Sequence, residues 1–217
     1  MKRMQLLTQM INTGVIAVVR AATAEKAVQV ADAVIKGGIT GVELTYSVPN
    51  ADSVIGELTE RYAHTDVVVG AGTVLDPTSA RLAIIAGAKF IVSPVFDREV
   101  ALMCNLYQVP YVPGVYTPTE AQTALKYGSE VVKLFPGKMA GVGAIKEYQG
   151  PFPYLNVMPS GGVNTANMQS WFDAGAIVVG AGGGLTAPAD QDDFAGVTRN
   201  AKAYVDEYQR IRGGMLV

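Results

Sequence analysis

Eight short apolar segments recur along the 217-residue chain, and they restrict its fold more than any other feature. Each is nearly continuous in apolar residues rather than alternating, which is typical of strands buried on both faces. We therefore predict eight buried strands. They are Val15–Arg20, Gly41–Thr45, Val67–Gly72, Phe90–Ser93, Tyr111–Gly114, Val131–Phe135, Leu155–Pro159 and Ile177–Gly180.

Amphipathic stretches separate these segments and carry the signals of helix ends. Asp76-Pro77 places a capping residue before a proline at the first helical position. Glycine follows helices repeatedly, as in Gly37-Gly38 and Gly175-Ala176, which marks repeated strand–helix units. The expected helices are Lys2–Asn12, Ala24–Gly37, Pro77–Gly87, one that opens at Thr117-Pro118-Thr119-Glu120, Thr165–Ala174 and Gln191–Arg210.

The strict alternation of strands and helices predicts an α/β protein with a parallel sheet. Eight such units close most naturally into a single (β/α)₈ TIM barrel with an extra N-terminal helix. We see no linker or composition break, so residues 1–217 are predicted to form one domain. A doubly wound open sheet is the alternative, because a pattern of elements does not show closure.

Charge and composition argue against several classes of partner. The formal net charge is −2 and basic residues form no cluster, which argues against a nucleic-acid partner. Polar residues such as Gln5 and Thr8 interrupt any secretory signal segment near the N-terminus. No apolar run approaches the length of a membrane span. We expect a cytoplasmic protein with no membrane partner.

The single histidine and the single cysteine are not good candidates for chemistry. His64 precedes a predicted strand and is expected on a surface loop. With this histidine expected on a surface loop, none is left for a Ser-His-Asp triad, and a single histidine argues against most transition-metal sites. Cys104 lies in an apolar helical run and is expected to be a buried structural thiol.

Two charged residues, Lys133 and Glu43, each interrupt an apolar strand. A charge in a buried strand is costly unless it is paired or neutralised. One interpretation is an ion pair that only holds the barrel together. The other is catalytic: desolvation disfavours the ammonium, a neutral amine attacks a ketone to form an iminium, and Glu43 moves protons. The iminium accepts electrons as a metal otherwise would, so we expect no metal or other cofactor.

Glycine-rich stretches follow the last two predicted strands. They contain Ser160, Gly161 and Gly162, and then Gly182 and Gly183. Barrels often bind a phosphate group at this place through backbone N–H groups, although glycine also serves tight turns. A dinucleotide fingerprint is excluded, because its third glycine falls at Leu185. We predict a phosphate site in these loops.

In these motifs the sequence resembles the class I aldolases that cleave 2-keto-3-deoxy-6-phosphogluconate (KDPG) or 4-hydroxy-2-oxoglutarate (KHG). The resemblance spans nearly the whole chain. It rests on Val18-Val19-Arg20, Val42-Glu43-Leu44-Thr45, Gly70-Ala71-Gly72-Thr73, Ser93-Pro94, Val112-Pro113-Gly114, Thr117-Pro118-Thr119-Glu120, Lys133-Leu134-Phe135-Pro136 and Ser160-Gly161-Gly162-Val163.

The resemblance implies a homotrimeric (β/α)₈ barrel with Lys133 as the Schiff-base lysine and Glu43 as the proton-transfer residue. It implies that Thr73 and Pro94 line the pyruvyl pocket and that Phe135 packs beside the iminium. The residues implied to hold the anionic ends of the substrate are Arg20, Gly161 and Gly162.

Two positions depart from the family pattern. An arginine that binds the keto-acid carboxylate usually follows the glutamate by four residues, and here that position is Ser47. A serine common in the last phosphate loop is replaced by Gly183. Arg20, Thr73 or backbone N–H groups then have to bind the carboxylate, and backbone donors have to bind the phosphate.

The predicted function is therefore reversible cleavage of KDPG, or a close 2-keto-4-hydroxy acid, to pyruvate and glyceraldehyde 3-phosphate, or to pyruvate and glyoxylate from KHG. An aldolase for the galactonate epimer is an alternative, since no residue we can name selects the configuration at C4. A phosphosugar isomerase or epimerase and a non-catalytic sugar-phosphate-binding protein are further alternatives. Both leave the placement of Lys133 and Glu43 unexplained.

Overall fold

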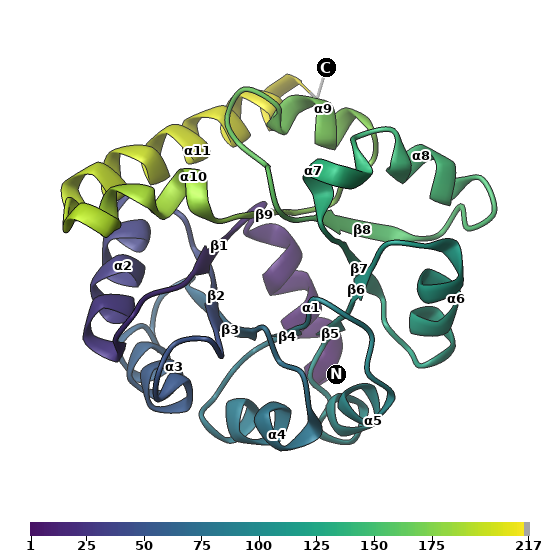
Figure 1. The fold of residues 1–217 in the computed structure, drawn as a ribbon, viewed down its shortest axis with the longest axis horizontal. Coiled ribbons are helices and arrows are strands. Elements are labelled where there is room, and N and C mark those ends of the chain that lie inside the picture. The colour runs from purple at the N-terminus through teal and green to yellow at the C-terminus, as the bar shows by residue number, and fades with distance from the viewer. Residues whose placement is uncertain (215–217) are drawn as a thin grey trace.

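The computed structural model describes residues 1–214, in which strands alternate with helices from end to end (Figure 1). The elements are α1 (Lys2–Asn12), β1 (Val15–Val19), α2 (Ala24–Lys36), β2 (Gly41–Thr45), α3 (Ala51–Arg61), β3 (Val68–Gly72), α4 (Pro77–Ile85), β4 (Ile91–Val92), α5 (Arg98–Tyr107), β5 (Tyr111–Val112), β6 (Gly114–Val115), α6 (Pro118–Lys126), β7 (Val131–Leu134), α7 (Gly137–Ala140), α8 (Ala144–Gln149), β8 (Asn156–Pro159), α9 (Met168–Asp173), β9 (Val179–Ala181), α10 (Gly183–Thr186), the 3₁₀ helix η1 (Ala187–Gln191) and α11 (Phe194–Gly214).

The strands form two parallel sheets that curl around a common centre, with helices on the outside (Figure 1). The larger sheet has six strands in the order β5-β4-β3-β2-β1-β9, and the smaller has three in the order β6-β7-β8. Isolated bridges join Val157 to Ala176 and Ser160 to Gly180, between the smaller sheet and the β9 edge of the larger one. The predicted α/β class and parallel pairing are confirmed.

A proline divides the predicted strand Tyr111–Gly114 into β5 and β6. β5 pairs with β4, whereas β6 pairs with β7. Pro113 has no N–H to donate to a ladder, but its carbonyl accepts a hydrogen bond of 2.8 Å from the Lys133 N–H. The chain therefore passes from one sheet to the other at this residue.

Side-chain capping starts several helices directly after the strand that precedes them. Thr23, Asp76, Asp97 and Thr117 each accept a hydrogen bond from a backbone N–H in the first turn of α2, α4, α5 and α6 respectively. Thr117 and Glu120 form the reciprocal capping box. These caps fix where the chain leaves the carboxyl end of a strand.

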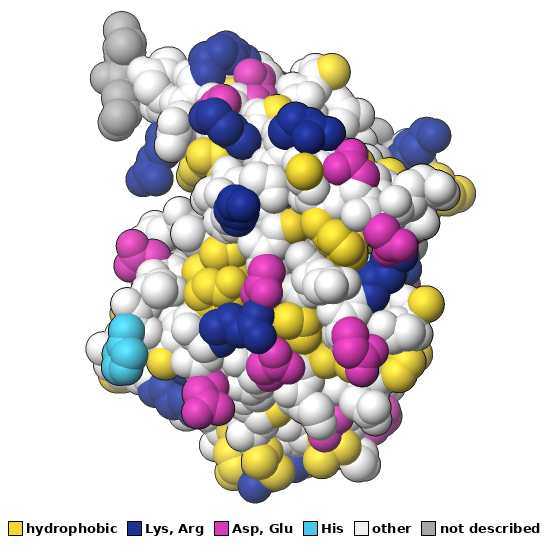
Figure 2. All heavy atoms as spheres, turned by 90° about the vertical axis from the view of Figure 1, so that its left-hand side faces the viewer, with side chains coloured by type: hydrophobic (Ala, Val, Ile, Leu, Met, Phe, Trp, Pro, Cys, Tyr) yellow, Lys and Arg dark blue, Asp and Glu magenta, His cyan; other side chains and the backbone are white. Residues whose placement is uncertain are grey.

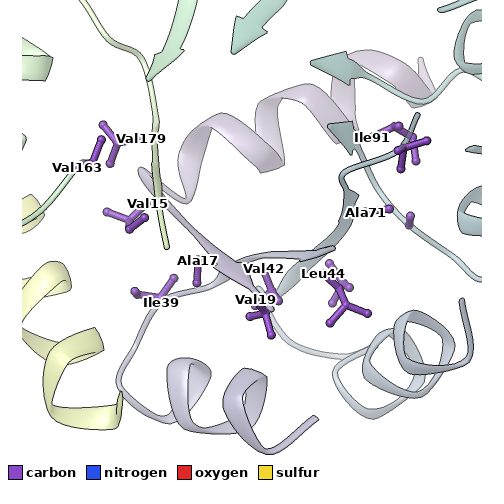
Figure 3. Packing of buried hydrophobic residues seen from close by; sticks show 14 of the residues in the cluster. Val15, Ala17, Val19, Ile39, Val42, Leu44, Ala71, Ile91, Val163 and Val179 are labelled. Atoms are coloured by element: carbon purple, nitrogen blue, oxygen red, sulfur yellow. The ribbon is translucent and has the colours of Figure 1, made fainter. Parts of the chain in front are cut away.

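Alternate strand residues face two different apolar layers, because successive side chains of a strand point to opposite faces. The outer layer packs the sheets against the helices, and includes Val15, Ala17 and Val19 of β1 (Figure 3). The inner layer holds Ile16, Phe90 and Met158, together with Met10 from α1. The N-terminal helix is therefore part of the core, and lies behind the strands in Figure 1.

The surface seen in Figure 2 has acidic and basic side chains interspersed, without a large region of one sign. His64 is exposed, and Cys104 is fully buried in α5. Burial raises the pKa of the Cys104 thiol to about 12. Within residues 1–214, no helix is both long and apolar enough to cross a membrane.

Candidate active site

Lys133 and Glu43 lie on the inner face of the curled sheets, on different sheets. The neighbours of Lys133 in β7, Val132 and Leu134, belong to the outer apolar layer, so the lysine side chain points inward. The same alternation turns Glu43 of β2 inward. Lys133 Nζ lies 3.4 Å from Glu43 Oε1, and the two residues are 3% and 0% exposed. The structure thus brings Lys133 and Glu43 next to each other.

The geometry of this pair is poor for an interaction that serves only stability. Its distance of 3.4 Å exceeds that of a strong charge-assisted hydrogen bond, which is about 2.8 Å. The other oxygen, Glu43 Oε2, is buried without a hydrogen-bond partner among the described residues. A buried ion pair offsets its desolvation only with close contact and full hydrogen bonding. The unused oxygen instead leaves an acceptor available to a bound ligand.

Two glycines of β3 make room for the side chains of Glu43 and Phe90, and sequence reasoning did not identify this role. A Cβ on Gly72 would lie 2.5 Å from Glu43 Cγ and 2.6 Å from Cδ. A Cβ on Gly70, the residue paired with Glu43 across the sheet, would collide with the Phe90 ring. The small residues in Gly70-Ala71-Gly72 were the available signal, since glycine in a strand marks a close approach.

Phe135 adjoins Lys133, and Gly161 adjoins Phe135. Lys133 Nζ lies 5.2 Å from the centroid of the Phe135 ring, within the range of a cation–π contact. The edge of the same ring lies 3.5 Å from the position of a Cβ on Gly161. Phe135 thus connects Lys133 with the glycine loop that follows β8.

Pro94 approaches the strand next to Lys133. Gly114 of β6 is the register partner of Lys133, and a Cβ on Gly114 would overlap the Pro94 carbonyl group. Gly114 is therefore a second glycine whose role appears only in three dimensions. The segment that follows β4 therefore packs closely against β6, the strand that pairs with the lysine strand β7.

Thr73 directly follows Gly72 and adopts a left-handed backbone conformation, with φ of 55°. This conformation is unfavourable for a β-branched residue, and such strain gathers at binding sites. The Thr73 side chain is half-buried.

The glycine loop after β8 is held by backbone hydrogen bonds from the first residues of α7, which follows β7. Gly137 N–H donates to the Ser160 carbonyl at 2.8 Å, and Lys138 N–H donates to the Gly161 carbonyl at 2.7 Å. Gly161 and Gly162 have φ values of 87° and 93°, which side chains rarely tolerate. The loop and α7 therefore form one fixed unit.

β9 and the glycines that follow it adjoin the loop after β8 and the end of β1. A Cβ on Gly180 would lie 2.8 Å from Ser160 Oγ, and one on Gly182 would lie 3.7 Å from Val18 Cβ. Gly183 faces open space.

Arg20 and Ser47 lie exposed on neighbouring strand ends. Thr45 Oγ1 lies 2.7 Å from Ser47 Oγ and donates a 3.0 Å hydrogen bond to the Val19 carbonyl. Across residues 1–214, the hydrogen bonds and ion pairs do not include the Arg20 side chain. The structure thus places Lys133 beside Glu43 and Phe135, with Gly161 next to the Phe135 ring and Pro94 against β6. Arg20, Gly162 and Gly183 are exposed.

Other parts of the described chain offer less for chemistry. A groove of about 1230 Å³ lies at the opposite, amino end of the strands, lined by α1 and by the segments that precede β2, β3 and β4. It contains neither Lys133 nor Glu43. Among residues 1–214, no three His, Cys, Asp or Glu side chains lie close enough to hold a metal ion.

Comparison with known proteins gives one consistent result. The family model described as KDPG and KHG aldolase matches residues 7–200. A 2-dehydro-3-deoxy-phosphogluconate aldolase of Treponema pallidum is 36% identical over 188 residues, which are 85% of this chain and 88% of the relative. A 2-dehydro-3-deoxy-6-phosphogalactonate aldolase of Escherichia coli is 31% identical over 195 residues, or 89% of this chain and 94% of the relative.

A solved structure resembles the fold throughout. The KDPG aldolase of Legionella pneumophila, captured with pyruvate as a covalent carbinolamine, superposes with a TM-score of 0.83 at 28% identity. The match covers 92% of this chain and 97% of the other.

Proposed function

Because the chain belongs to the KDPG and KHG aldolase family, we propose that it cleaves KDPG, or a closely related 2-keto-4-hydroxy acid, through an imine on Lys133. The protein is an aldolase, a carbon–carbon lyase. The observation that carries the proposed mechanism is the buried lysine 3.4 Å from a carboxylate that has one oxygen unused. The products are pyruvate and glyceraldehyde 3-phosphate, or pyruvate and glyoxylate when the substrate is KHG.

The first step is attack of Lys133 Nζ on the C2 carbonyl of the keto acid. Lys133 is 3% exposed and lies beside the Phe135 ring, and in its neutral form this buried amine is the nucleophile that adds to the carbonyl carbon. Glu43 lies close enough to pass protons to and from the carbinolamine, which loses water to give the iminium.

The second step is cleavage of the C3–C4 bond. The iminium accepts the electron pair of that bond and becomes an enamine, while the C4 hydroxyl loses its proton and the aldehyde leaves. Glu43 accepts this proton, directly or through a water molecule, and its unpartnered Oε2 is the free acceptor. Protonation of the enamine at C3 and hydrolysis of the iminium release pyruvate and restore the Lys133 amine.

The substrate-binding roles follow from position along the site. Thr73 and Pro94 would line the pyruvyl end, and Phe135 would pack against the imine carbon. Arg20 is exposed directly after β1, and it would bind the carboxylate in place of the family's arginine at the position of Ser47. The phosphate would be bound by backbone N–H groups of the loops that contain Ser160, Gly161, Gly162, Gly182 and Gly183.

We also propose that the two sheets complete one closed (β/α)₈ barrel, which makes residues 1–217 a single domain. The bridges from Val157 and Ser160 toward β9, and the passage of the chain through Pro113, support closure at the two breaks in the ladder. A cytoplasmic location remains a prediction from the sequence.

A homotrimer is the proposed assembly, and α4 and α5 offer an apolar surface for it. Four exposed side chains form this surface: Leu82, Ile85, Leu102 and Leu106, of which Leu106 is 74% exposed. The two helices are neighbours, since the Arg81 guanidinium stacks on the Tyr107 ring at 4.3 Å. Large exposed apolar patches mark interaction surfaces.

Borohydride trapping tests the mechanism directly. The enzyme is incubated with pyruvate, reduced with borohydride, digested and examined by peptide mass spectrometry. We expect one reduced pyruvyl adduct, located on Lys133, and none in Lys133→Met. An active preparation without an adduct at Lys133 would refute imine chemistry. Full activity in Lys133→Arg would favour an isomerase or epimerase, and substrate binding without turnover would favour a binding protein.

The galactonate epimer is the second candidate substrate, since the Escherichia coli aldolase for it matches 89% of this chain. A panel of both C4 epimers and unphosphorylated KHG, compared by kcat/KM, assigns the substrate. A strong preference for KHG would contradict the proposed phosphate site.

A further inference from the structure

The short helix α7, which follows β7, carries a cation, Lys138, that the proposed mechanism leaves unused. Lys138 is exposed, and its side chain takes part in none of the hydrogen bonds or ion pairs found across residues 1–214. Its backbone is fixed, because its N–H donates a 2.7 Å hydrogen bond to the Gly161 carbonyl. A free ammonium group is thus attached to a rigid part of the site.

The stem of this lysine starts directly against the glycine loop. A Cβ on Gly162 would lie 2.7 Å from Lys138 Cβ and 3.4 Å from its Cγ. Any side chain at position 162 would therefore displace Lys138. The flexible four-carbon side chain of Lys138 can place its ammonium group over a ligand bound at Gly161 and Gly162.

The neighbouring loops supply backbone donors but little charge. Gly161, Gly162, Gly182 and Gly183 have no side chains, and Gly183 faces open space. A phosphate dianion is bound much more strongly when a cation adds charge-assisted hydrogen bonds to backbone donors. Lys138 lies in α7, which follows β7, and Arg20 directly follows β1.

We propose that Lys138 determines specificity for phosphorylated substrates by binding the terminal phosphate over the Gly161–Gly162 loop. This inference rests on the proposed function and adds to it the residue that distinguishes a phosphorylated from an unphosphorylated 2-keto acid. Lys138 binds the substrate far from the reacting carbons, so it affects substrate affinity rather than bond cleavage.

Steady-state kinetics of Lys138→Ala and Lys138→Gln, with KDPG and KHG measured in parallel, test the proposal. Loss of one exposed charge-assisted contact is expected to raise KM for KDPG by about ten-fold and to leave kcat nearly unchanged. KM for KHG should stay at the wild-type value. Inorganic phosphate should inhibit the wild type competitively and the variants about ten-fold more weakly. Lys138→Arg should retain most of the affinity.

Lys36→Ala is the matched control, because it removes the same charge from the last turn of α2. An unchanged KM for KDPG in Lys138→Ala, or an equal rise for both substrates, would overturn the proposal. Borohydride trapping on the wild type distinguishes a failure of the proposed function from a failure of the role proposed for Lys138. Absence of a Lys133 adduct refutes the proposed function, whereas an adduct together with unaltered selectivity in Lys138→Ala refutes only the role of Lys138.

Discussion

Substitution of Gly72 by alanine should damage the site without touching either proposed catalytic residue. The added methyl group would lie 2.5 Å from Glu43 Cγ and 2.6 Å from Cδ, whereas ordinary van der Waals contact begins at 3.4 Å. Gly72 does not have a positive φ, so the backbone itself accepts alanine. The collision must therefore be relieved by moving the Glu43 side chain.

The required movement is roughly 1 Å, and it acts on the carboxylate that lies 3.4 Å from Lys133 Nζ. Misplacement of a catalytic group by that amount lowers turnover by about 100-fold. Overpacking should also reduce the free energy of unfolding by about 1–3 kcal/mol, which the fold can tolerate. Lys133 stays in place, so the pyruvate adduct should still form, although more slowly.

The assay compares kcat on KDPG, the urea unfolding curve and borohydride trapping for the wild type and Gly72→Ala. Gly143→Ala is the control, because a Cβ on Gly143 meets nothing within 4 Å and its φ is −60°. Turnover at the wild-type rate by folded Gly72→Ala would contradict this prediction, because Glu43 would then not need its present position. Complete unfolding of the variant would be seen in the urea curve and would leave no trapped adduct.

Four further outcomes are expected. Lys133→Met should abolish turnover and lower the free energy of unfolding by about 3 kcal/mol, because it leaves Glu43 buried without a partner. Adding Glu43→Gln should restore most of that free energy in urea titrations, and no recovery would mean that the two groups are not coupled. Ser47→Arg should lower KM for KHG by about ten-fold, and an unchanged KM would show that another group binds the carboxylate. Leu106→Glu should shift the assembly toward monomer in sedimentation velocity, and an unaltered profile would place the interface elsewhere. Because burial raises the pKa of Cys104 to about 12, its thiol should resist iodoacetamide at pH 8 until the chain unfolds, and rapid labelling of the native protein would contradict this.

The sequence could predict the strands and the unusual charges within them. Apolar runs and helix caps are local signals, and they located the eight strands closely. Lys133 and Glu43 were recognisable because burying a charge in an apolar strand costs free energy unless the charge is paired or neutralised. Pro113 lies inside one predicted strand. The division of that strand into β5 and β6 depends on which neighbouring strand pairs with each half.

Only the tertiary structure decided which residues meet. Glu43 and Lys133 are 90 positions apart in the sequence, and the curling of two sheets brings their charged groups to 3.4 Å. A one-dimensional pattern does not contain that curvature. The same holds for the glycines. In the sequence, Gly72 and Gly114 are only small residues in strands. In the structure, they leave space for Glu43 and Pro94, which come from other segments of the chain. Strand periodicity thus determines which way a side chain points, while the distances that make Lys133 and Glu43 a pair depend on how the whole chain packs.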